Sequence, residues 1–162
     1  MITKLELTNF KNFAKAEIGF GPMSLLLGAN ATGKSNVRDA LRFLHGIARG
    51  YDLAEILGEK YGEGGQLLWG GIRGGTREAC FLGKTTFRIG VELEEGKGQS
   101  LRRYSYAIEV LCGDHGSAPR VSSESLYETK GWKRVGIVPQ DGSSVPPRLE
   151  WRQPEIVFDS HP

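Results

Sequence analysis

The sequence lacks the features that mark several special protein classes. Its only two cysteines, Cys80 and Cys112, lie far apart without a Cys-x-x-Cys or Cys/His spacing. A zinc site and a disulfide framework are therefore not expected, and both thiols are interpreted as reduced, as in cytoplasmic proteins. No apolar run approaches the ~20 residues of a membrane-spanning helix, and the N-terminus has no signal-peptide pattern. These absences predict a cytoplasmic protein without a membrane partner.

An excess of one charge is also lacking, because 21 lysines and arginines oppose 19 acidic residues, for a net charge of +2. A protein that coats nucleic acid is normally far more basic. Arg102 and Arg103 could still touch DNA, although charged strand faces are usually just solvated. No basic stripe accompanies the tryptophans, so all three are expected to pack rather than to stack on bases: Trp69, Trp132 and Trp151.

Glycine, in contrast, is abundant, with 23 in 162 residues, about twice the average usage. The glycines separate well-patterned apolar segments, so they indicate many turns rather than low complexity. The length suits one domain with a real hydrophobic core.

The residue pattern predicts an α+β fold. Residues 4–10 and 13–20 alternate apolar and polar positions around Lys11 and Asn12, which is typical of a β-hairpin. Residues 23–27 (MSLLL) form a short apolar run, the pattern of a strand buried on both faces. The glycine-rich residues 61–79 are expected to form a long loop. Further strands are predicted in the rest of the chain, the first two as an antiparallel hairpin: 85–93, 103–111, 121–128 and 132–138.

A helical period over residues 34–48 predicts one amphipathic helix. Arg38, Asp39 and Arg42 fall off its apolar stripe. Residues 52–60 are predicted as a second short helix. The stripe itself is expected to consist of Val37, Ala40, Leu41, Leu44 and Ile47 or Ala48.

The segment from Gly28 to Ser35 reads G-x-x-x-x-G-K-S, the P-loop pattern, between a predicted strand and a predicted helix. Its backbone N–H groups and the helix N-terminus would form a nest for phosphate. Lys34 would reach the β- and γ-phosphates, and the hydroxyl of Ser35 would bind Mg²⁺. The residues expected to bind the nucleotide are Asn30, Ala31, Thr32, Gly33, Lys34, Ser35 and Asn36.

The first fifty residues resemble the N-terminal lobe of the ABC-type ATPase heads of SMC, RecF, RecN and OLD-like proteins, which are AAA-family P-loop ATPases. The matching motifs are L-x-L-x-N-F-K-N-F over 5–13, L-L-L-G-x-N-x-T-G-K-S-N over 25–36 and A-L-x-F-L over 40–44. More loosely, residues 64–138 resemble the β-rich segment of RecF/OLD-like ATPases.

This resemblance implies that the chain binds ATP with Mg²⁺. It also implies that Lys11 and Asn12 lie beside the ribose, base and α-phosphate. The alternative is a solvated hairpin tip, because Lys-Asn is an ordinary turn pair. In complete relatives two heads sandwich two ATP molecules as a dimer. Hydrolysis there is coupled to DNA work, such as repair or anti-phage defence, so DNA is an expected partner of the full-length protein.

The same resemblance assigns residues 1–150 to one ATPase lobe. The lobe divides into a P-loop core (1–57), a glycine-rich loop (58–84) and an antiparallel β segment (85–138). The remaining tail, 151–162, contains prolines and is expected to be disordered.

Several motifs of a complete head have no clear match in the sequence. No LSGG-like signature loop occurs. The best Walker B candidate, Ile156–Asp159, has Ser160 where a catalytic glutamate belongs. His161 and residues 138–141 match the switch histidine and the Q-loop only superficially. A C-terminal lobe is therefore expected to be missing, and the chain alone should bind ATP but hydrolyse it poorly.

Two alternatives come from other functional classes. One is a stand-alone nucleotide-binding or protein-interaction module without hydrolysis. The other is a P-loop kinase or GTPase-like enzyme, but the hairpin predicted at 85–111 argues against the alternating βα units of such enzymes.

Overall fold

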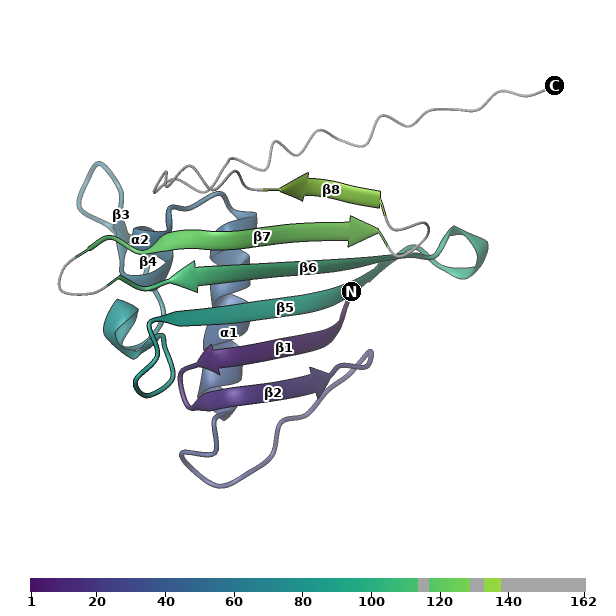
Figure 1. The fold of residues 1–162 in the computed structure, drawn as a ribbon, viewed down its shortest axis with the longest axis horizontal. Helices are drawn as coiled ribbons and strands as arrows, with labels where there is room; N and C mark the ends of the chain where they lie inside the picture. Colours follow the sequence, from purple (N-terminus) through teal and green to yellow (C-terminus); the bar gives the residue numbers. More distant parts are fainter. Residues whose placement is uncertain (114–116, 129–132, 138–162) are drawn as a thin grey trace.

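One antiparallel sheet of six strands, with helix α1 packed on one face, organises the chain (Figure 1). The structure is a computed structural model and describes residues 1–113, 117–128 and 133–137. The strand order is β2-β1-β5-β6-β7-β8, and β3 and β4 form a separate small hairpin. The elements are β1 (Ile2–Phe10), β2 (Phe13–Gly19), α1 (Lys34–Ala48), α2 (Leu53–Leu57), β3 (Lys60–Tyr61), β4 (Leu67–Trp69), the 3₁₀ turn η1 (Gly75–Glu78), β5 (Thr86–Glu95), the 3₁₀ turn η2 (Gly98–Ser100), β6 (Arg102–Leu111), β7 (Arg120–Glu128) and β8 (Lys133–Ile137).

The observed class is mixed, an antiparallel sheet with two helices, as the sequence predicted. β1 and β2 form the expected hairpin, in which Phe10 pairs with Phe13. β5 and β6 form the expected antiparallel pair, with Ile89 opposite Ile108. The helix predicted over 34–48 is confirmed as α1.

The core lies between α1 and the alternate residues of the central strands. Phe43 of α1 meets Phe87 of β5 edge to face, with ring centroids 5.4 Å apart. Apolar burial of this kind is the main favourable contribution to folding. The fully buried side chains that the central strands contribute to this core are Leu5, Leu7, Phe10, Phe87, Ile89, Ile108 and Val110.

The prediction of a strand at residues 23–27 is wrong for this structure, because no strand forms there and the side chains are open to solvent. Met23 is 89% exposed, Leu25 73% and Leu27 81%. A strand needs a neighbour for its backbone hydrogen bonds, and in the described part of the chain no strand pairs with this segment. These apolar side chains therefore contribute little buried surface to the fold.

The prediction that residues 61–79 form one long loop is also only partly right. The segment contains β3–β4 and η1, and Trp69 is buried against α2, as its packing role predicted. Part of its glycine excess has a steric reason, because Gly71 has φ +59° and a Cβ there would collide with the carbonyl oxygen of Gly58. The second helix is shorter than predicted and ends before Gly58.

Candidate nucleotide-binding site

The P-loop residues have the backbone geometry of an anion nest. Ala31 and Gly33 have φ values of +66° and +99°, so left-handed residues alternate with ordinary ones along the loop. Thr32 braces the turn, because its Oγ1 donates to the carbonyl oxygen of Ala29 at 2.9 Å. The loop continues directly into α1, where Asn36 N and Val37 N already donate to the carbonyl oxygen of Gly33, so the N–H groups of Lys34 and Ser35 remain for a ligand. This arrangement favours a negatively charged group.

Lys34 bends back over the start of its own loop. Its Nζ donates to the carbonyl oxygen of Gly28 at 2.6 Å and to that of Ala29 at 2.5 Å. An ammonium group has three N–H donors, so one remains for a ligand. Ser35 follows on the first turn of α1 with an exposed side chain.

Gly33 allows the β1–β2 hairpin tip to pack against the start of α1. A Cβ at this position would lie 2.6 Å from the ring of Phe13 and 3.1 Å from Nδ2 of Asn12. The atoms nearest to Gly33 thus belong to hairpin side chains. This packing is a second reason for a glycine here, besides the close approach of a phosphate that the sequence predicted. Asn12 is further tied to the helix, because its Oδ1 accepts a hydrogen bond from Nδ2 of Asn36 at 2.7 Å.

Lys11 is not part of a solvated hairpin tip, so that alternative is wrong for this residue. Its side chain is only 6% exposed, and its Nζ donates to the carbonyl oxygen of Arg73 and lies 3.6 Å from Oδ2 of Asp39. Burial lowers the pKa of Lys11, although the carboxylate of Asp39 opposes this effect. The ammonium is thus fixed in a position that costs desolvation energy.

Asp39 is the buried centre of an ionic network that the sequence reasoning missed. Its carboxylate is 2% exposed, and its Oδ2 accepts a hydrogen bond from Nε of Arg73 at 3.0 Å and forms an ion pair with Nη2 of Arg73 at 2.9 Å. Nη2 of Arg73 also donates to Oδ1 of Asn36 at 2.8 Å. The helical period placed Asp39 off the apolar stripe, yet it is buried because Arg73 and Lys11 reach it from other segments. The one available signal was a lone arginine inside a glycine-rich run.

Backbone strain is concentrated around this site. Among residues 1–113, 117–128 and 133–137, the non-glycine residues with positive φ are Asn9, Lys11 and Ala31. For Lys11 and Ala31 this conformation costs about 1–2 kcal/mol and persists only where the surroundings fix it, whereas asparagine tolerates it better. Two of the three residues are held by the segment after η1: Phe81 N donates to Asn9 O at 2.7 Å, and Lys11 N donates to Ala79 O at 2.9 Å. The strain supports a functional role for this part of the molecule.

A hollow of about 470 Å³ opens beside the hairpin tip. It is rich in cationic and amide side chains, which suits an anionic or hydrogen-bonding ligand. The side chains of this kind that line it are Lys11, Asn12, Asn36, Arg73, Arg77 and Lys84.

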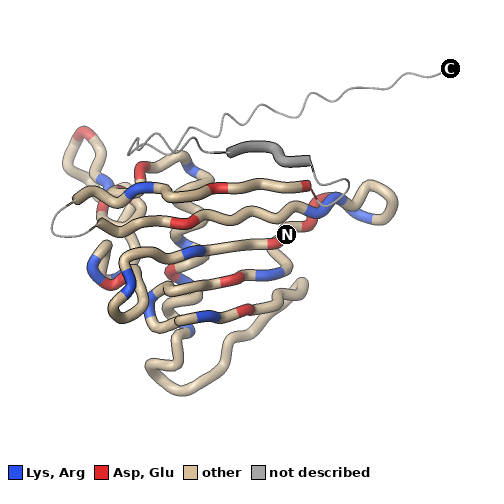
Figure 2. The backbone as a smooth tube through the Cα atoms, viewed as in Figure 1, with Lys and Arg blue, Asp and Glu red and all other residues tan. Residues whose placement is uncertain are grey.

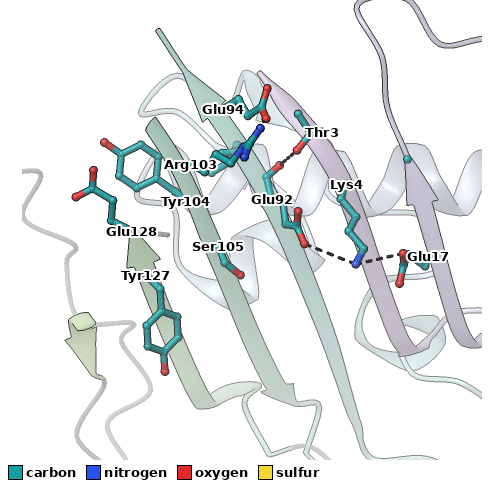
Figure 3. Close-up of a pocket in the computed structure, with 12 residues that line it drawn as sticks. Thr3, Lys4, Glu17, Glu92, Glu94, Arg103, Tyr104, Ser105, Tyr127 and Glu128 are labelled. Atoms are coloured by element: carbon teal, nitrogen blue, oxygen red, sulfur yellow. Dashed lines mark hydrogen bonds and ion pairs between the residues drawn. The ribbon is translucent and has the colours of Figure 1, made fainter. Parts of the chain in front are cut away.

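A larger hollow, of about 820 Å³, lies over the ends of the strands (Figure 3). Its charges are largely satisfied within the sheet: Lys4 lies 3.2 Å from Glu17 and 3.6 Å from Glu92, and Arg103 lies 2.8 Å from Glu94. Basic and acidic positions are mixed over the whole sheet, without a region of one sign (Figure 2). The ion pair of Arg103 therefore weakens the case for a DNA contact at this position.

Two other features are absent from the described part of the chain. In the described residues, no three His, Cys, Asp or Glu side chains gather as metal ligands. Nor is any helix in that part of the chain long and apolar enough to cross a membrane. The Walker B candidate Ile156–Asp159, the Q-loop candidate at 138–141, His161, Trp132 and Trp151 lie outside the described residues.

Comparisons with known proteins agree with the resemblance seen in the sequence. The family described as "AAA domain, putative AbiEii toxin, Type IV TA system" matches residues 23–110, more than half of the chain. The chain is also 30% identical over 122 residues to the DNA replication and repair protein RecF of two strains of Porphyromonas gingivalis. This match covers 75% of the chain and 32% of each relative, so the chain spans about a third of the length of these curated relatives.

Proposed function

Because the chain belongs to the family described as "AAA domain, putative AbiEii toxin, Type IV TA system", we propose that it is the ATP-binding N-terminal lobe of a RecF-like ATPase. The observation that carries this proposal is the P-loop itself, with alternating positive φ values at Ala31 and Gly33 and with Lys34 folded over it. The nest provides N–H donors where an ATP-binding protein needs them.

The residues around the loop take specific roles in this proposal. Lys34 exchanges its carbonyl partners for phosphate oxygens, a stronger charge-assisted contact. Asn36 and Asn12, already joined at 2.7 Å, hold the hairpin tip against the loop. Arg73 and Lys11 supply positive charge beside it. These two cations are held in position by Asp39 before a nucleotide arrives.

The donor set fits Mg²⁺ at one position. Ser35 presents a hydroxyl next to the nest, and magnesium in nucleotide sites typically takes one or two protein oxygens together with phosphate and water. When bound, the ion would neutralise charge on the β- and γ-phosphates. The residues proposed to contact ATP and its metal are Lys11, Asn12, Asn30, Ala31, Thr32, Gly33, Lys34, Ser35 and Asn36.

Hydrolysis, in this proposal, needs a second lobe. The exposed residues Met23, Leu25 and Leu27 immediately precede the P-loop, and an apolar run open to water is costly to leave unpaired. We expect this segment to become a strand beside one from the missing C-terminal lobe, which would also bring the Walker B residues. Head-to-head dimerisation, and coupling to DNA repair or to anti-phage defence, would belong to that longer protein.

The direct test is the affinity of the chain for ATP with and without Lys34. Lys34→Ala should weaken ATP binding about 10- to 150-fold, because a charge-assisted hydrogen bond is worth roughly 1.5–3 kcal/mol. Isothermal titration calorimetry with Mg²⁺ and ATP measures this difference. Lys97→Ala is the matched control, since it removes an exposed lysine in the β5–β6 turn.

Two outcomes would contradict parts of the proposal. Equal affinities of wild type and Lys34→Ala would remove the P-loop from the binding site. Rapid turnover of ATP by this chain alone would show that no catalytic part is missing. Binding without turnover is the expected result, and it agrees with either an incomplete head or a nucleotide-binding module.

A further inference from the structure

Two thiols beside the proposed nucleotide site lie in contact. The Sγ atoms of Cys80 and Cys112 are 2.9 Å apart, although the residues are separated by 32 positions in the sequence. Both are free cysteines. Cys80 follows η1 and forms an antiparallel bridge with Phe10, whereas Cys112 directly follows β6, where its N–H donates to the carbonyl oxygen of Thr85 at 2.8 Å. The fold thus brings Cys80 and Cys112 into contact, although they are far apart in the sequence.

The two thiols have unequal surroundings. Cys112 is only 5% exposed, whereas Cys80 is partly exposed and lines the hollow beside the hairpin tip. The hydrogen bond between the thiols lowers the pKa of Cys80, while the same bond and burial raise the pKa of Cys112. A small disulfide reagent can therefore reach Cys80 from the hollow, and Cys80 is also the better nucleophile of the pair.

We propose that Cys80 and Cys112 are a redox-modification site that closes reversibly to an intramolecular disulfide. The oxidant is a low-molecular-weight disulfide such as oxidised glutathione. The Cys80 thiolate attacks one sulfur of the oxidant, whose S–S bond breaks and releases one thiolate. Cys112 then loses its proton and attacks Sγ of Cys80, which releases the second thiolate. The two protein thiols lose two electrons and two protons, and the two product thiols take them up.

The position of the bond gives it a structural consequence. The residues on either side of Cys80 hold the strained hairpin tip by backbone hydrogen bonds. Phe81 N donates to Asn9 O, and Lys11 N donates to Ala79 O. A disulfide would tie this segment, and the loop that carries Arg73, to the end of β6. It would also restrict the unfolded chain, which stabilises the folded state. This inference concerns the chain itself and holds whether or not ATP binds.

A redox titration of the folded and the unfolded chain tests the proposal. Samples are equilibrated with reduced and oxidised glutathione at a series of ratios, with and without urea. The remaining free thiols are then alkylated, and mass spectrometry measures how many of them carry the label. Folding and disulfide formation are linked. The factor by which the disulfide raises the folding equilibrium constant is therefore also the factor by which folding favours formation of the disulfide. The folded chain should retain its disulfide in buffers at least about tenfold more reducing than those that reduce the unfolded chain. Oxidation should raise the Tm by about 5–10 °C.

The controls separate a true pair from two independent thiols. Cys112→Ala should accumulate a mixed glutathione disulfide on Cys80, and Cys80→Ser should resist oxidation and show no Tm shift. The wild-type titration needs no variant, so a variant that fails to fold does not affect it. The proposal is overturned if the folded chain keeps two free thiols in buffers that oxidise the unfolded chain, if only mixed disulfides form, or if oxidation lowers the Tm.

Discussion

The two flanks of the α1 N-terminus are built in opposite ways. On one side, the ionic network of Lys11, Asn12, Asn36, Asp39 and Arg73 is closed, with its carboxylate 2% exposed and every member bonded to another segment. On the other side, the segment Met23–Leu27 carries large apolar side chains that are mostly open to solvent. The network finds all its partners within residues 9–84. The open segment has no strand beside it in the described part of the chain.

This contrast indicates which part of the proposed nucleotide site the chain can form by itself. The cationic side is pre-organised, since Lys11 and Asp39 are buried and the half-exposed Arg73 is bonded to Asp39. The strand predicted at residues 23–27, directly before the P-loop, is not formed. In the proposed function, this lobe binds phosphate itself, and another segment covers its apolar side. The two flanks therefore predict very different responses to mutation.

The largest effect is expected from Asp39→Ala. This change leaves the buried ammonium of Lys11 without its carboxylate, and removing one partner of a buried ion pair typically costs about 3–5 kcal/mol. Urea denaturation followed by circular dichroism measures the free energy of unfolding. Glu63→Ala, an exposed acid in the β3–β4 turn, is the control and should change it by less than about 0.5 kcal/mol. A loss below about 1 kcal/mol for Asp39→Ala would mean that the network is not closed in solution.

A smaller but still clear effect is expected from Gly33→Ala, which acts where the two flanks meet. The new Cβ would lie 2.6 Å from the Phe13 ring at a φ of +99°, so strain and overpacking should cost about 2–4 kcal/mol. The matched control is Gly19→Ala, because nothing lies within 4 Å of a Cβ there. Thermal unfolding of both variants measures the difference. Equal stability of the two would show that the hairpin tip does not rest on the start of α1.

Local patterns in the sequence were sufficient for most of the fold. Period-two alternation predicted β1, β2, β5 and β6, and the helical stripe predicted α1, because each pattern depends on neighbours within one element. The P-loop motif is local for the same reason, and its role in binding a nucleotide stays a prediction. Arg73 and Asp39 were missed, since their contact joins a glycine-rich loop to a helix 34 residues away, and no local pattern encodes such a pairing. The cysteine pair was missed for that reason too.

The failed strand at residues 23–27 has a different cause. The run MSLLL does fit a strand buried on both faces, so the pattern was read correctly, but a strand also depends on a partner. The same run in a longer protein would have a partner in the proposed second lobe.

The smallest effect on stability is expected from changes in the open segment itself. Leu25→Ser and Leu27→Ser should each alter the free energy of unfolding by less than about 0.5 kcal/mol, because these side chains are 73% and 81% exposed and have little contact to lose. Leu5→Ala is the comparison, since Leu5 is fully buried in β1 and should lose about 2–5 kcal/mol. Urea denaturation at two protein concentrations measures all three. A loss above about 1.5 kcal/mol for Leu27→Ser that grows with concentration would mean that a second copy of the chain already covers this segment. The same loss without concentration dependence would mean that the segment packs within the chain, and the contrast between the two flanks would then be wrong.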